Sequence, residues 1–356
     1  MSDPIINILF TSVGNPAFPV IVGELRKQSV FRFNIIGTDI RKEAPGLYLT
    51  DKSYLVSRLS EKNFIDEIFS IIEENKIDIL FPLSTIDQNF FSANKAIIEK
   101  KGVTVMVSDP DPVYVANNKY NLYELLKQES INPLKYDKIP AGELVNLIEK
   151  YEKPFVLKKE EGAGGQGTYI VAETSSGLRE DDKKFYLPLD ELLLQPGLYV
   201  SDTTIISEYL PGDEFSVDTL SFEGKMYYAV IRKRTKSVGG LALESTVVAD
   251  DEIEKLAERI IKITGLSYIN NLQFKVSKSG HYKMMEINPR VPGTIKLSLA
   301  AGADMIMDAI KLAKGQREFS KPALVIGTSF FRYWDGAVAT PDNMSALIKL
   351  NLQHAQ

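Results

Sequence analysis

The chain has 356 residues, which is too long for one ordinary hydrophobic core, so we expect two or three packed units. The formal net charge of −5 argues against a general nucleic-acid binder, which usually carries a basic face. The absence of cysteine excludes disulfides, thiolate catalysis and sulfur-bound metals. With His281 and His354 as the only histidines, any bound metal must be hard and oxygen-ligated: magnesium, manganese or calcium.

The N-terminal residues contain no basic leader followed by a cleavable apolar core, so they do not predict a signal peptide. No apolar stretch approaches the roughly 20 residues that a bilayer-spanning helix needs. We therefore expect a cytoplasmic protein without a membrane partner.

The first third of the chain alternates short apolar runs with helical spacing, which is typical of a parallel α/β sheet. A polar turn at 11–16 opens the first helix, which should end near Gln28, and a run of aspartates and prolines at 109–112 marks the first boundary. The expected strands are 5–10, 34–37, 78–82 and 103–107, and the further expected helices are 61–75 and 89–100.

The rest of the chain predicts two mixed units. The first contains helix 118–128, strands 136–139 and 154–159 around helix 141–151, strand 168–172, an exposed loop at 173–184 and strand 203–209. The second contains a meander of strands 214–222 and 226–232, helix 251–264, strands 272–276 and 282–287, and a helix from about 296 to 314.

The run Met-Met-Glu-Ile-Asn-Pro-Arg at 284–290 carries the strongest chemical signal. A hairpin turn centred between Ser279 and Gly280 places Gln273 opposite Glu286, and strand alternation puts Asn288 on the face of Glu286. Arg290 follows on the same side, so the cluster offers oxygen donors for magnesium and a guanidinium for phosphate. From these residues alone, a solvent-exposed polar face explains the pattern about as well.

Two other segments are weaker candidates. Strand 156–159, which contains Lys158, precedes a glycine-rich loop at 162–167 whose backbone N–H groups could wrap phosphates, although a plain hairpin connection is the simpler alternative. The loop is neither a Walker A loop nor a dinucleotide fingerprint, since no Gly-Lys-Ser/Thr ends it and a strand follows it. In the turn at 207–218, backbone groups could hydrogen-bond an adenine edge and Glu214 could accept from ribose hydroxyls. Taken by itself, however, this segment is typical of a surface turn.

In this order and spacing, residues 118–314 resemble the ATP-grasp superfamily, and the preceding α/β unit resembles its pre-ATP-grasp domain. The pattern of Gln273, Glu286, Asn288 and Arg290 is closest to the branch of the carbamoyl phosphate synthase large subunit. The resemblance implies an α/β and α+β fold, in which a parallel-sheet domain precedes a two-lobed ATP-grasp fold. The implied parts are a pre-ATP-grasp domain at 1–115, a small lobe with a glycine-rich flap at 116–206, a large lobe with the magnesium site at 207–318 and a C-terminal extension at 319–356.

The resemblance also assigns roles to residues. Gln273, Glu286 and Asn288 would bind two Mg²⁺ (or Mn²⁺) ions, with Glu286 bridging them, and Arg290 would grip the transferred phosphoryl group. Arg232 and Arg234, near an expected mobile loop at 237–240, would be additional phosphate or carboxylate clamps. The residues implied for ATP are Lys119 and Lys158 at the phosphates or the adenine region, Gly164, Gly165 and Gly167 in the flap, Glu208, Tyr209 and Leu210 at the adenine, and Glu214 at the ribose.

The implied activity is that of an ATP-dependent carboxylate–amine ligase, which forms an acyl phosphate and releases ADP and phosphate. Its partners would be small-molecule carboxylates and amines, without nucleic acid, and a homodimer is one oligomeric state to consider. Carbamoyl phosphate synthesis itself is doubtful because the chain holds one ATP-grasp module. The alternatives are an enzyme that phosphorylates bicarbonate or carbamate and a non-catalytic nucleotide-binding regulatory module.

The second substrate is not identified by the sequence. Asp87 follows a predicted strand and could hold a substrate ammonium or cap the next helix. Arg332 could reach a carboxylate, although an apolar strand explains most of its surroundings.

Overall fold

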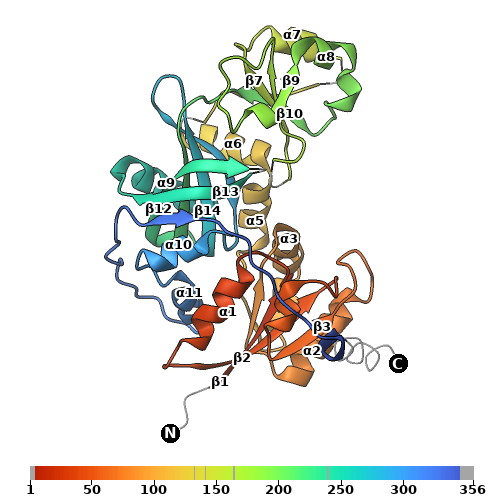
Figure 1. Ribbon diagram of the computed structural model, residues 1–356, viewed down its shortest axis with the longest axis vertical. Coiled ribbons are helices and arrows are strands. Elements are labelled where there is room, and N and C mark those ends of the chain that lie inside the picture. Colours follow the sequence, from red (N-terminus) through yellow and green to blue (C-terminus); the bar gives the residue numbers. More distant parts are fainter. Residues whose placement is uncertain (1–4, 132, 141, 163–164, 239, 345–356) are drawn as a thin grey trace.

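The computed structural model describes residues 5–344, apart from 132, 141, 163–164 and 239. Three β-sheets, which we call A, B and C, follow one another along the long axis, with helices around them (Figure 1). Sheet A lies at the bottom of this view, sheet C in the middle and sheet B at the top. This arrangement confirms the predicted fold class, in which an N-terminal domain with a parallel sheet (sheet A) precedes two lobes that each contain a sheet and helices.

Sheet A has the order β3-β2-β1-β4-β5, and all of its strand pairs are parallel. On one face, α1 packs into a core that also contains α11, and on the other face α2 and α3 pack into a second core. The strands are β1 (Ile5–Thr11), β2 (Arg32–Asp39), β3 (Lys52–Leu55), β4 (Ile79–Pro82) and β5 (Thr104–Val105), and the helices are α1 (Phe18–Arg26), the 3-10 turn η1 (Pro45–Tyr48), α2 (Phe64–Asn75), α3 (Thr85–Ala93) and α4 (Lys95–Glu99).

Two helices, α5 (Pro110–Asn117) and α6 (Lys119–Gln128), lead from sheet A to sheet B. Sheet B has the order β6-β10-β7-β8-β9 and its own small core. Its elements are β6 (Tyr136–Lys138), α7 (Leu144–Ile148), β7 (Phe155–Lys159), β8 (Tyr169–Ala172), η2 (Lys183–Phe185), β9 (Tyr186–Pro188), α8 (Leu189–Leu194), η3 (Pro196–Leu198) and β10 (Thr204–Glu208).

Sheet C has the order β15-β14-β11-β12-β13-β16, and its pairs are antiparallel. Its elements are β11 (Glu214–Phe222), β12 (Lys225–Val238), β13 (Leu241–Val248), α9 (Asp251–Thr264), β14 (Tyr268–Val276), β15 (Tyr282–Asn288), α10 (Ile295–Ala300), α11 (Met305–Ala313) and β16 (Ser329–Phe331).

The two faces of sheet C have different neighbours. One face packs against α9 and α6 through Val217, Ile231 and Leu272. Part of the other face joins α10, α11 and sheet A in one continuous core. The large lobe and the N-terminal domain are therefore packed together, since one apolar core spans both.

Several predicted elements differ from the structure near prolines and glycines. The run at 109–112, which the sequence places at the first boundary, starts α5, a helix that was not predicted, because proline fits the first turn of a helix, where its missing N–H is not needed. The helix expected at 89–100 is divided at Asn94 into α3 and α4. The helix expected at about 296–314 is divided between α10 and α11, where Gly302 has a φ of 104°.

Three strands were not predicted. The first is β3, an edge strand of sheet A whose sequence Lys-Ser-Tyr-Leu contains no apolar run. The second is β9, a short strand that pairs with β8, and the third is β13, which pairs with an extended β12. The segment expected as a mobile loop at 237–240 therefore includes the end of β12 at Val238, and Gly239 lies outside the described residues. None of the described helices is both long and apolar enough to cross a membrane.

Candidate functional site

A block of polar side chains crosses one face of sheet C. Residues directly opposite one another in adjacent strands point to the same face, so two paired rows define this block. The first row contains Glu286, Gln273, Ser216 and Arg232, and the second contains Asn288, Asn271 and Asp218. A sheet face buried only for stability would be apolar, because buried polar groups cost free energy unless they are paired.

The predicted pairing of Gln273 with Glu286 is confirmed, although the turn differs from the prediction. Nearer the turn the partner of Phe274 is Met284, one residue short of the predicted register. A bulge between Gln273 and Phe274 leaves Met285 as the extra residue and restores the predicted register beyond it. The bulge thus places Glu286 beside Gln273.

Glu286, Asn288 and Arg290 form one hydrogen-bonded chain. Asn288 Nδ2 donates to Glu286 Oε1 at 3.1 Å, and Arg290 Nη2 donates to Asn288 Oδ1 at 3.2 Å. Burial lowers the pKa of Arg290, and the nearby Glu286 opposes this. The sequence missed Asn271, which lies opposite Asn288 and accepts from Gln273 Nε2 at 3.4 Å. Asn271 could have been predicted, because it lies two residues before Gln273 and therefore on the same face of the strand.

Two lysines reach this cluster from the side of the small lobe. Lys119 Nζ lies 3.6 Å from Glu286 Oε2, and the buried Lys158 Nζ donates to Tyr123 Oη at 2.8 Å. Tyr123 donates in turn to the carbonyl oxygen of Met285. Burial lowers the pKa of Lys158 to about 7, and Lys119 adds to this lowering while Glu286 opposes it. Cations and a carboxylate thus meet where the two lobes face each other.

Arg232 and Arg234 are buried in sheet C, and Arg234 Nη2 donates to the carbonyl oxygen of Gly240, in the segment 237–240, at 2.8 Å. Arg232 Nη2 lies 2.6 Å from Asp218 Oδ1, and both side chains are almost completely buried, with exposed fractions of 1% and 0%. Arg234 Nη1 lies 2.5 Å from Glu214 Oε1. The Nε atoms of both arginines are buried without a hydrogen-bond partner within the described ranges.

The glycine-rich flap is described in part, since Gly164 lies outside the described residues. Gly165 has a φ of 75°, and a Cβ atom there would come within 2.8 Å of the Phe185 ring. Gly167 has a φ of 69°. Both conformations favour glycine. Lys119 Nζ donates to the carbonyl oxygen of Gly162 at 3.1 Å, which connects the loop to the cluster at Glu286.

The residues predicted around the adenine lie at the link between the lobes. Glu208 Oε1 accepts from the backbone N–H of Lys135 at 2.7 Å, and Leu210 is buried in the core of sheet C. Tyr209 Oη donates to Asp182 Oδ2 at 2.7 Å. The segment 173–184 was expected to be an exposed loop, but Asp182 also pairs with Lys275 at 3.0 Å. This segment therefore contacts the large lobe.

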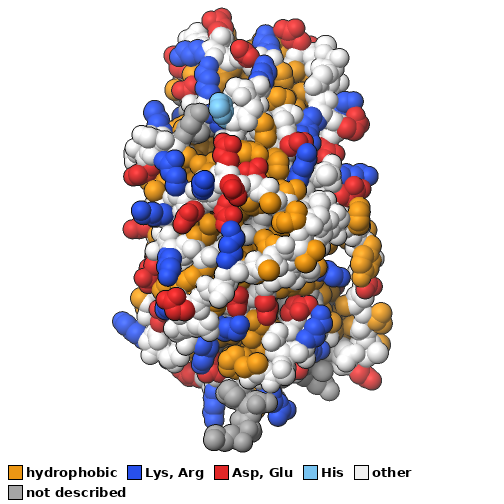
Figure 2. Space-filling view, turned by 90° about the vertical axis from the view of Figure 1, so that its left-hand side faces the viewer, with side chains coloured by type: hydrophobic (Ala, Val, Ile, Leu, Met, Phe, Trp, Pro, Cys, Tyr) orange, Lys and Arg blue, Asp and Glu red, His pale blue; other side chains and the backbone are white. Residues whose placement is uncertain are grey.

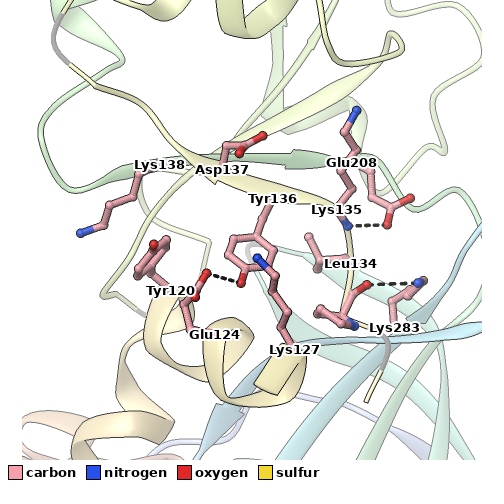
Figure 3. A pocket seen from close by; sticks show the side chains of 11 residues that line it. Tyr120, Glu124, Lys127, Leu134, Lys135, Tyr136, Asp137, Lys138, Glu208 and Lys283 are labelled. Atoms are coloured by element: carbon pink, nitrogen blue, oxygen red, sulfur yellow. Dashed lines mark hydrogen bonds between the residues drawn. The ribbon is translucent and has the colours of Figure 1, made fainter. Parts of the chain in front are cut away.

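Two cavities lie near these residues. One of about 110 Å³ lies on the polar block and is lined by Asn271, Gln273, Asn288 and the four arginines 232, 234, 290 and 332. The other, of about 640 Å³, lies between α6 and the segment at 133–138 (Figure 3). The larger cavity holds Glu208 and several lysines, but Gln273, Asn288 and Arg290, which line the smaller cavity, do not line it. We therefore place the candidate chemistry at the smaller cavity.

The N-terminal domain also reaches the site. Arg290 Nε donates to Thr85 Oγ1 at 3.1 Å, at the start of α3. Ser84, and not Asp87, is the N-cap residue of this helix, while the Asp87 side chain in the first turn hydrogen-bonds Ser84 and accepts from Thr11 Oγ1 at 2.7 Å. Burial raises the pKa of the Asp87 carboxyl, and its hydrogen bonds oppose this.

Side chains of both charges are mixed on one face of the molecule (Figure 2). Figure 2 shows lysine and arginine side chains interspersed with aspartate and glutamate there. A protein that binds the phosphate backbone of a nucleic acid usually has a patch of lysine and arginine on one face.

Two family models match parts of the chain. The family described as "ATP-grasp in the biosynthetic pathway with Ter operon" matches residues 201–329, and the "PylC-like, N-terminal domain" matches residues 8–106. The first match covers most of sheet C, including its polar block, and the second covers most of sheet A.

Relatives and solved structures agree with these matches. Carnosine synthase 1 of Gallus gallus is 28% identical over 46% of this chain, and the carbamoyl phosphate synthase large chain of Bifidobacterium longum (strain DJO10A) is 23% identical over 62%. The chain spans about a fifth of each relative, 19% and 20% of their lengths. The structure of a biotin carboxylase complex from Campylobacter jejuni is similar, with a TM-score of 0.68, 17% identity and coverage of 91% of this chain and 74% of that one. At this identity the likeness shows a shared fold.

Proposed function

We propose that this chain is an ATP-dependent ligase that joins a carboxylic acid to an amine, a proposal supported by its matches to an ATP-grasp family model over residues 201–329 and to a PylC-like model over residues 8–106. The observation that carries the proposal is the meeting of Lys119 and Lys158 with Glu286, with Arg290 on the same side. Such an arrangement binds a polyphosphate through cations and a divalent ion through oxygen donors.

The donor set at the polar block fits magnesium. Glu286 supplies one carboxylate, and Gln273 and Asn288 supply amide oxygens. The described residues contain no cluster of three or more His, Cys, Asp or Glu side chains that could hold a metal. Magnesium usually binds to proteins through one or two carboxylates together with substrate phosphates, so a site with one carboxylate is sufficient. Magnesium held by these residues would neutralise negative charge on the ATP phosphates.

The proposed reaction has two steps. A carboxylate oxygen of the acid attacks the γ-phosphorus, the bond from that phosphorus to the β–γ bridging oxygen breaks, and ADP leaves. The amine nitrogen then attacks the acyl carbon, the bond from that carbon to the phosphate oxygen breaks, and the amine loses a proton. Catalysis is chiefly alignment and charge neutralisation, which suits a chain with two histidines.

The chain's own side chains would divide this work. Lys119 and Lys158 would hold the phosphates, and the guanidinium of Arg290 would hold the transferred phosphoryl group and then the acyl phosphate. The glycine-rich flap, which contains Gly165 and Gly167, would close over the phosphates and keep water away from the intermediate. The segment from Glu208 to Leu210 and the Glu214 carboxylate would hold the adenosine part.

A second candidate is an enzyme that phosphorylates bicarbonate or carbamate. The observation that favours it is the match to a carbamoyl phosphate synthase large chain over 62% of this chain. The third candidate, a nucleotide-binding module without turnover, is opposed by the joint presence of Glu286, Asn288 and Arg290 in one hydrogen-bonded chain.

A screen for ADP release tests these candidates. The protein is incubated with ATP, Mg²⁺ and pairs of one acid and one amine, with bicarbonate among the acids. ADP release that requires one acid and one amine supports the ligase, and release with bicarbonate alone supports the second candidate. ATP binding without release by any pair would contradict both. The variant Glu286→Gln is the negative control, and Glu258→Gln, an exposed carboxylate on α9, is the matched control.

A further inference from the structure

The cavity of about 110 Å³ on the polar block is unusually rich in arginine. Arg232, Arg234, Arg290 and Arg332 all line it, and no carboxylate belongs to its lining. The first two come from β12, the third follows β15, and the fourth follows β16. Elements distant in the sequence thus bring four guanidinium groups to one small space.

These arginines fall into two pairs. Arg232 and Arg234 have carboxylate partners in Asp218 and Glu214, so the protein itself balances their charges. In the part of the chain that the structure describes, Arg290 and Arg332 form no ion pair with a carboxylate. A charge removed from water without a counterion is costly. The cavity therefore has two guanidinium groups that an anion would stabilise.

Arg332 is held firmly in place by backbone carbonyl groups. Its Nε donates to the carbonyl oxygen of Ala242 at 3.0 Å, and its Nη2 donates to that of Gly293 at 3.1 Å. A guanidinium has five N–H donors, so these two bonds leave donors for a ligand. Burial lowers the pKa of Arg332, as expected of a cation partly removed from water. The carbonyl groups orient the guanidinium without neutralising it.

We propose that Arg332 binds a second anionic group of the acid substrate, so that the acid is a short dianion such as a dicarboxylate. This inference rests on the proposed function, in which Arg290 faces the carboxylate that is phosphorylated. A guanidinium can take a carboxylate through two parallel hydrogen bonds, which also fixes the orientation of the acid. The small cavity volume limits the length of the acid between its two anionic groups.

The alternative is a single small anion, such as bicarbonate, that occupies the cavity without a second charged group. It predicts no advantage for an acid with two carboxylates over an acid with one. Matched acids that differ in one carboxylate therefore distinguish a dianionic substrate from a single small anion.

The first experiment measures ADP release with Mg²⁺, ATP and hydroxylamine as the amine, using the pairs succinate and butyrate, aspartate and 2-aminobutyrate, and glutamate and norvaline. In each pair the first acid has two carboxylates, which we call the dianion regardless of its ammonium group, and we expect one of these acids to be used at least about tenfold better than its partner, since a guanidinium binds a carboxylate through charge-assisted hydrogen bonds. Arg332→Gln should lower kcat/KM for that dianion about tenfold or more, mainly through KM, and lower kcat/KM for its partner with one carboxylate much less. Arg317→Gln, which removes an arginine outside the cavity, should change neither.

The second experiment measures binding without turnover, which separates this inference from the proposed ligase activity. Thermal unfolding is followed with ADP and Mg²⁺ present, and each dianion is added to the wild-type protein and to Arg332→Gln. We expect stabilisation of the wild type by one dianion and its loss in the variant, even if no acid supports ADP release. Equal binding by both proteins, binding of monoanions as tight as that of dianions, or no binding of any dianion would overturn the inference. Arg332→Lys, which keeps the charge but loses the fork, should bind with intermediate affinity.

Discussion

One face of sheet C is divided into two regions of opposite character. Where it meets α10, α11 and sheet A, it carries Leu220, Tyr228, Val230 and Val247 in a continuous core. A few residues along the same strands, Asp218, Ser216 and Gln273 point from that same face. Packing explains the apolar region completely, whereas the polar region costs free energy that ligands would offset. The comparison predicts that changes in the apolar region alter stability and that changes in the polar region alter activity.

The largest effect on stability should come from a residue of the polar region, contrary to the division between a region for stability and a region for activity. Asp218 lies in the polar block, yet it is fully buried and accepts from Arg232, Asn271 and Ser298. Asp218→Asn leaves the Arg232 charge without a partner, so we expect the free energy of unfolding to fall by about 3–5 kcal/mol. Urea denaturation measures it. The double change Asp218→Leu with Arg232→Met should recover part of the loss, and no recovery would argue against the ion pair as the cause.

A change in the apolar region should affect stability alone. Leu220→Ala removes a fully buried side chain, and we expect the free energy of unfolding to fall by about 2–5 kcal/mol because a cavity remains. ADP release per folded molecule, measured well below the unfolding temperature, should stay within about twofold. A selective loss of activity in a folded variant would show that the two regions are not separate.

The opposite outcome is expected at Glu286. Glu286→Gln keeps the shape of the side chain but removes the one carboxylate beside Gln273 and Asn288, so ADP release should fall at least about 100-fold, or about 2.7 kcal/mol. The unfolding temperature should not fall, because functional residues are rarely optimal for stability. Activity close to that of the wild type would remove Glu286 from the metal site.

Lys158 should give the smallest effect, as a pH dependence of stability. Its pKa is about 7 in the folded protein because of burial, below the ordinary lysine value of 10.5. Between these two values the unfolded chain binds the additional proton, so stability should rise as the pH rises from 7 towards 10. Urea denaturation of the free protein at pH 7 and pH 9 should show this rise. Lys158→Met should reduce the rise, and an equal rise in both proteins would contradict a buried, displaced lysine.

The sequence predicted the part of the site that depends on local geometry. Strand alternation and a hairpin turn were sufficient to bring Gln273, Glu286, Asn288 and Arg290 together. Near the turn, the strands pair one residue away from the predicted register, and the bulge at Met285 restores that register at Glu286. The sequence did not predict this bulge, so the correct pairing of Glu286 depended on a compensation that no local rule gives.

The remaining site residues depend on contacts between distant segments. Arg332 reaches the cavity only because β16 pairs with β13, a strand that the sequence did not reveal. Thr85 meets Arg290 because the N-terminal domain shares a core with sheet C. Asp182 contacts Lys275 across the lobes. Such contacts follow from how complete elements pack, so residue types and spacing along the chain did not predict them.

The central claim is that the polar block transfers the γ-phosphoryl group of ATP to a carboxylate. The most direct measurement follows ¹⁸O from the carboxylate of the stimulating acid into the phosphate released with Mg²⁺, ATP and an amine. Attack by the carboxylate oxygen predicts one ¹⁸O atom in each phosphate released, and none with Glu286→Gln above background. ADP release with unlabelled phosphate would mean attack by water on ATP and would contradict the ligase mechanism.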